Sequence, residues 1–64
     1  MKEAAKKAIE EQAKATVAAY NGKNEYESWE AAKARLDGMI YMATVTGILT
    51  VEEIDEIKKT AKRA

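Results

Sequence analysis

The stretch MIYMATVTGIL, residues 39–49, carries no charged side chain, although 34% of the residues in this chain are charged. On an α-helix, at about 100° per residue, its apolar side chains point in nearly every direction around the helix axis. Such a helix must be covered on more than one side. In a chain of 64 residues the cover comes from two flanking helices, from a second copy of the protein or from another partner.

Part of this stretch points away from the stripe that Leu36 and Ile40 begin at helical spacing. Two flanking helices cover most of a helix that lies between them, but not all of it. We therefore expect an exposed apolar group that binds a partner, since such patches commonly mark interaction sites. The predicted partner-binding residues are Tyr41, Met42, Val45 and Ile48.

The composition argues against catalysis and against nucleic-acid binding. The chain has no His and no Cys, the usual sources of general bases, nucleophiles and metal ligands, and its net charge is zero. The carboxylates show no spacing typical of a metal loop. We therefore predict no catalytic residues, no metal site, no cofactor, no small-molecule substrate and no nucleic-acid partner.

The absence of Cys and of a readable export signal suggests a reducing, cytoplasmic location. The apolar run at residues 39–51 is shorter than the roughly 20 residues that a membrane-spanning helix requires. Proline is also absent, and a chain rich in Ala, Glu and Lys favours helices. We expect an all-α protein without a membrane span.

Residues 2–20 are predicted to form the first helix, with Ile9, Ala13, Thr16 and Tyr20 on its inner stripe and Val17 at the margin. This stripe is weak, because alanine buries little area. Asn21 and Gly22 then supply residues that tolerate the left-handed conformation in which many helices end.

Residues 25–46 are predicted to form the second helix. Asn24 followed by Glu27 matches a capping box, and Tyr26 and Trp29 are expected to face inward with Leu36. Gly38 interrupts the pattern, but the inner stripe keeps its phase across it, so a continuous helix is expected. Gly47 is the predicted end.

Residues 51–62 are predicted to form the third helix, with the clearest start in the chain. Thr50 and Glu53 form a capping box, and Leu49 and Ile54 a hydrophobic staple around it. The expected buried stripe comprises Val51, Ile54, Ile57 and Ala61.

Together these elements predict a single domain over residues 1–64. It is a small all-α three-helix bundle with the long 25–46 helix at its centre and short loops at residues 21–24 and 47–50.

The sequence GILTVEEIDEIKK, residues 47–59, resembles the helical hairpin of bacterial short C-terminal domains, and similar strings occur in small phage and mobile-element proteins. The resemblance implies a helix–turn–helix junction in a small interaction protein.

Two hypotheses for function follow. The first is a non-enzymatic protein–protein interaction module that self-associates through the 25–46 helix. The second is a small phage or mobile-element inhibitor or adaptor that binds a host or phage protein as a monomer.

Overall fold

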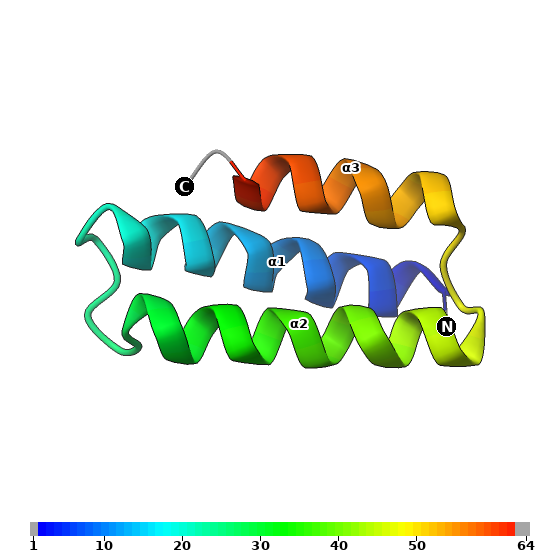
Figure 1. Ribbon diagram of the computed structural model, residues 1–64, viewed down its shortest axis with the longest axis horizontal. Coiled ribbons are helices and arrows are strands. Elements are labelled where there is room, and N and C mark those ends of the chain that lie inside the picture. The colour runs from blue at the N-terminus through cyan, green and yellow to red at the C-terminus, as the bar shows by residue number, and fades with distance from the viewer. Residues whose placement is uncertain (1, 63–64) are drawn as a thin grey trace.

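The computed structural model describes residues 2–62, and these residues form three α-helices and no β-strand. The helices are α1 (Lys2–Tyr20), α2 (Trp29–Thr46) and α3 (Val51–Lys62), and they lie side by side along the long axis of the molecule (Figure 1). The prediction of a small all-α three-helix bundle is confirmed for this part of the chain. Residues 1, 63 and 64 of the predicted domain lie outside the described residues.

The helix between the other two is α1, which contacts both α2 and α3 (Figure 1). The prediction that the 25–46 helix occupies the centre is therefore wrong. The predicted inner position of Tyr20 is also wrong, because this last residue of α1 lies beyond the buried stripe and is 58% exposed. The buried inner side chains of α1 are Ile9, Ala13 and Thr16, with exposed fractions of 4%, 1% and 2%. Two of these three are small, so neighbouring helix axes can approach α1 closely from both sides. A narrow stripe that buries little area per residue is thus suited to the central place.

The core is one cluster that takes side chains from all three helices and from the loop before α3. Its buried members are Ile9, Ala13, Leu36, Ile40, Ala43, Leu49, Ile54 and Ile57. Met39, Ile48 and Ala61 are partly buried against it. Among residues 2–61, Thr16 is the buried polar side chain, and it donates its hydroxyl proton to the carbonyl of Gln12 at 2.8 Å, so its burial leaves no unpaired hydroxyl donor.

The start of α2 differs from the prediction. The helix begins at Trp29 rather than at residue 25, and the hydroxyl of Ser28 caps it by accepting a hydrogen bond from the backbone N–H of Ala31 at 3.2 Å. Asn24 does accept bonds from the backbone N–H groups of Tyr26 and Glu27, at 2.9 and 3.1 Å. It caps a turn within the loop, however, so the loop runs over residues 21–28.

Tertiary bonds explain why no helix grows from Asn24. Its side-chain amide donates to the carbonyl of Ala15 in α1 at 3.2 Å. The Glu27 carboxylate, which a capping box would return to Asn24, instead accepts from the side chain of Gln12 at 3.3 Å and pairs with Arg35 at 3.3 Å. The loop is thereby attached to α1.

Two consequences follow for the aromatic residues of this region. The predicted inward position of Tyr26 is wrong, because Tyr26 belongs to the loop and is 94% exposed. Trp29 is half-buried, and its ring packs edge-to-face on Tyr20 with centroids 6.0 Å apart.

The glycines act as predicted at the ends of helices. The backbone of Gly22 has φ 73° just beyond α1, and Gly47 has φ 69° at the end of α2, where its N–H donates to the carbonyl of Thr44. Both are left-handed conformations that favour glycine. α2 continues without a break through Asp37 and Gly38, as the phase of its inner stripe predicts.

The start of α3 is confirmed at Val51, and both bonds of the capping box are present. The Thr50 hydroxyl accepts from the Glu53 N–H at 3.1 Å, and the Glu53 carboxylate accepts from the Thr50 N–H at 2.9 Å. Leu49 and Ile54 are both buried, as the staple predicts. The predicted burial of Val51 is wrong, because Val51 is 71% exposed. Leu49 and Ile54 fill the core side of this first turn, and Val51 lies at the margin of the stripe.

A pair of alanine substitutions tests this arrangement. Leu36→Ala is expected to lower the free energy of unfolding by about 2–5 kcal/mol, because it leaves a cavity in the core. Val51→Ala is expected to change it by no more than about 0.5 kcal/mol, because the side chain is exposed. Urea unfolding followed by circular dichroism measures both. A loss for Val51→Ala of about 2 kcal/mol or more would mean that α3 is rotated relative to the arrangement described.

Candidate functional site

Three of the four predicted partner-binding residues lie on the outer side of α2. Tyr41, Met42 and Val45 have exposed fractions of 66%, 56% and 62%. Their spacing of three and four residues makes them neighbours on one helix surface. They form the α2 outer face together with the exposed Ala31, Ala34 and Gly38.

The fourth predicted residue, Ile48, belongs to a different environment. It follows the end of α2, is partly buried and packs against the core. Ile48 and Met42 both line a shallow hollow between the first half of α1 and the second half of α2. Ile48 therefore lies at the edge of the α2 outer face and is not part of it.

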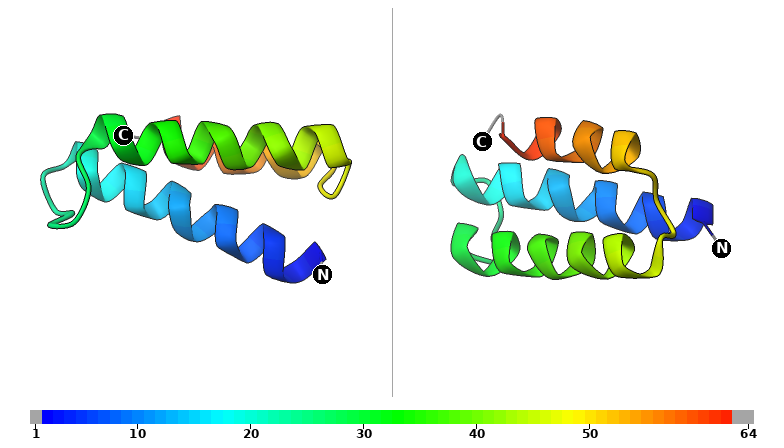
Figure 2. Two further views of the ribbon diagram at one scale, coloured as in Figure 1. Left: turned by 90° about the horizontal axis from the view of Figure 1, so that it is seen from below. Right: turned by 45° about the vertical axis from the view of Figure 1, so that its right-hand side comes forward.

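This hollow extends the apolar surface from α2 toward α1. Its lining is apolar except at a few atoms and includes Ala5, Ala8 and Met39, with Arg35 as its charged member. Figure 2 shows, in its left panel, the N-terminal part of α1 diverging from α2, the arrangement that leaves the hollow open. Sequence reasoning missed the hollow, because it depends on the angle between two helices rather than on either helix alone.

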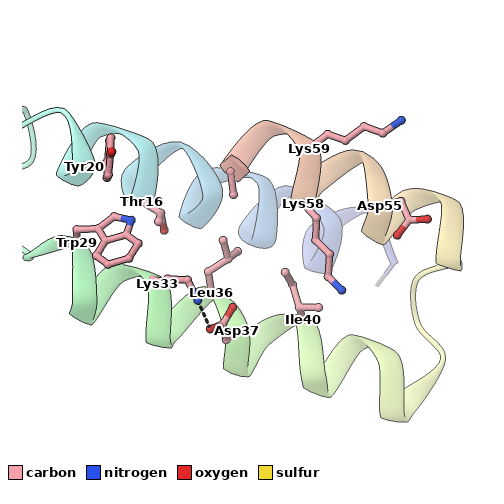
Figure 3. A pocket seen from close by; sticks show the side chains of 11 residues that line it. Thr16, Tyr20, Trp29, Lys33, Leu36, Asp37, Ile40, Asp55, Lys58 and Lys59 are labelled. Atoms are coloured by element: carbon pink, nitrogen blue, oxygen red, sulfur yellow. Dashed lines mark hydrogen bonds and ion pairs between the residues drawn. The ribbon is translucent and has the colours of Figure 1, made fainter. Parts of the chain in front are cut away.

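A second concave surface lies between α2 and α3 and has a volume of about 590 Å³. Figure 3 shows Tyr20 and Trp29 at one end of this groove, with Leu36 and Ile40 on the α2 side. Leu36 and Ile40 are already buried, with exposed fractions of 3% and 9%. A partner placed in the groove would therefore gain little apolar burial from them.

The rim of the groove carries charges of both signs. Lys33 and Asp37 pair at 3.1 Å on α2, and α3 contributes Asp55, Lys58 and Lys59 (Figure 3). Mixed charges give no strong preference for an anionic or a cationic ligand. Compared with the α2 outer face, the groove is the weaker candidate for a binding site.

Glu53 joins the first turns of α1 and α3 electrostatically. Its carboxylate lies 3.1 Å from the ammonium of Lys2 and 3.5 Å from that of Lys6. The hydrogen bond from the backbone N–H of Thr50 and the contact with Lys2 lower the pKa of Glu53 from 4.5 to about 2. Both lysines already face a carboxylate, so we interpret this cluster as a structural link and not as an anion site.

Among the residues that the structure describes, no three Asp or Glu side chains gather closely enough to hold a metal ion. None of the helices α1, α2 and α3 has the length and hydropathy needed to cross a bilayer.

Comparison with models of protein families, with curated proteins and with solved structures finds no match to this chain. The resemblance of residues 47–59 to bacterial short C-terminal domains stays a prediction, although those residues do form the expected junction between two helices. The function is therefore inferred from the geometry of the chain's own residues.

The lowered pKa of Glu53 predicts how the stability of the fold depends on pH. A depressed carboxyl pKa contributes stability above the ordinary value of 4.5, and that contribution is lost as the pH falls toward about 2. Glu53→Gln keeps an acceptor for the Thr50 N–H but removes the charge that faces Lys2 and Lys6. The variant is expected to be less stable than the unmodified chain at neutral pH, and the difference should shrink steadily below pH 4.5.

Urea unfolding over that pH range measures the effect. Glu52→Gln changes an exposed carboxylate in the same turn and is the matched control, which is expected to follow the unmodified chain. A stability difference for Glu53→Gln that does not change with pH would contradict the electrostatic link.

Proposed function

We propose that this chain is a non-enzymatic protein-interaction module that self-associates through the second half of α2. The observation that carries the proposal is the exposure of Tyr41, Met42 and Val45, each more than half exposed on one side of one helix. Adjacent exposed apolar side chains of this size are typical of protein-binding sites, where aromatic residues and Met are enriched.

The surroundings of these residues support a protein as the partner. The α2 outer face is convex and continues at Met42 into the shallow hollow beside α1, rather than enclosing a small molecule. The apolar contacts of α2 with α1 use the opposite side of the helix, where Ala32, Leu36 and Ile40 are buried. A partner can therefore cover the outer face without disturbing the core.

Self-association is favoured over a different partner by the size and charge of the chain. A 64-residue domain buries a small core, and a second copy would add apolar burial without cysteine or metal cross-links. The net charge of zero imposes no overall repulsion between copies. The second candidate, a monomeric phage or mobile-element inhibitor or adaptor, would use the same face on a host or phage protein.

Met42→Glu tests the proposal, because it places a charge on the apolar part of the α2 outer face. We expect the variant to sediment as a monomer at concentrations where the unmodified chain is a dimer, since an unpaired charge is costly in an apolar contact. Its helicity and melting midpoint as a monomer should stay close to those of the unmodified monomer, because Met42 is 56% exposed.

Val51→Glu is the matched control, since Val51 is an exposed apolar residue on α3, and it should leave association unchanged. An unmodified chain that stays monomeric at every accessible concentration would contradict self-association and favour the second candidate. Loss of helicity in Met42→Glu would show that Met42 supports the fold instead of the interface.

A further inference from the structure

Gly38 lies in the interior of α2, in helical conformation, and nothing within the chain requires a glycine there. A Cβ atom placed on Gly38 would meet no atom within 4 Å. Glycine in the middle of a helix lowers helix stability relative to alanine. Within one copy of the chain, Gly38 therefore brings a loss of stability without a packing gain.

The position of Gly38 suggests what does require it. It lies in the α2 outer face, one turn after Ala34 and one turn before Tyr41 and Met42, and the backbone at this point is exposed. A residue without a side chain allows the backbone of another helix to approach closely. The residues of the outer face that follow Gly38 have large exposed side chains, whereas the face residues that precede it are alanines.

Resting on the self-association proposed above, we infer that two copies of the chain pack with their α2 helices antiparallel and crossing at Gly38. In a pair related by a two-fold axis at this residue, positions equally far before and after Gly38 lie opposite each other. Ala34 of one copy then lies opposite Met42 of the other, and Ala31 opposite Val45. In both of these pairs a large side chain meets a small one, as an interlocking contact requires.

The charge on this face agrees with the antiparallel direction. Arg35 is a charged residue at the edge of the face, and its side chain is 66% exposed while paired with Glu27. Arg35 stands three positions before Gly38, so in the antiparallel pair the two Arg35 side chains are six residues apart along the helices, roughly 9 Å. This separation limits the repulsion between the two guanidinium groups. A parallel pair would instead place the two Arg35 side chains at the same height.

The absence of Cys from the chain permits a direct test of this crossing. Ala34→Cys and Met42→Cys chains are mixed in equal amounts and oxidised, and the disulfide-linked products are identified by mass. We expect the product that joins position 34 to position 42 to exceed the statistical share, because these positions face each other. Like positions are too far apart in the antiparallel pair for a disulfide.

A second pair, Ala31→Cys with Val45→Cys, repeats the test with Met42 unchanged, and Val51→Cys on α3 is the control for random collision.

Gly38→Leu adds an independent measurement. It should weaken dimerisation by about tenfold or more through overpacking of the crossing point. The monomer should stay folded, because the space around Gly38 is open within one copy.

The outcomes separate this inference from the proposed function. An excess of mixed disulfides for both pairs, with weakened association of Gly38→Leu, supports the antiparallel crossing. A dimer that gives statistical products, an excess of like-position products or full association of Gly38→Leu overturns the crossing but leaves self-association standing. Sedimentation of the unmodified chain as a monomer overturns both.

Discussion

The burial of the inner stripe of α1 against two helices at once is the contact on which the rest of this structure depends. Ala13 and Thr16 are almost completely buried, and their small side chains let α2 and α3 pack on the same helix. Because both neighbours turn their apolar stripes toward α1, each has an outer side without cover. On α3 that side is largely charged, but on the second half of α2 it is apolar.

Polar contacts then hold the two outer helices against α1 at opposite ends of the molecule. At one end Asn24, Gln12 and Glu27 connect the loop before α2 to α1, and at the other end Glu53 connects the start of α3 to Lys2 and Lys6. Individual exposed ion pairs stabilise a fold only slightly. These contacts therefore set the register and direction of helices whose attraction comes from the shared apolar core.

The features that depend on local sequence could be predicted. The bounds of α1 and α3, the capping box at Thr50 and the left-handed end at Gly47 all follow from residues within a few positions of each other. Features that depend on tertiary contacts could not. α2 begins at Trp29 rather than at the predicted residue 25, because Asn24 bonds to Ala15 and Glu27 bonds to Gln12, which are far away in the sequence.

The central position of α1 was not predicted, for a related reason. Apolar area favours the 25–46 segment as the centre, whereas close packing on two sides favours the small side chains of α1. The exposed position of Tyr41, Met42 and Val45 was predictable, because side chains opposite a buried stripe must face outward. The shallow hollow at Ile48 and the open space around Gly38 required the structure, since both depend on how neighbouring helices are placed.

The central claim is that the uncovered apolar side of α2 is completed by a second copy of the chain. The most direct test is the melting midpoint of the unmodified protein, measured by circular dichroism over a wide range of protein concentration. If association stabilises the folded chain, the midpoint must rise with concentration by several degrees for each kcal/mol or so of added stability. A midpoint that stays the same across the whole range would contradict the claim.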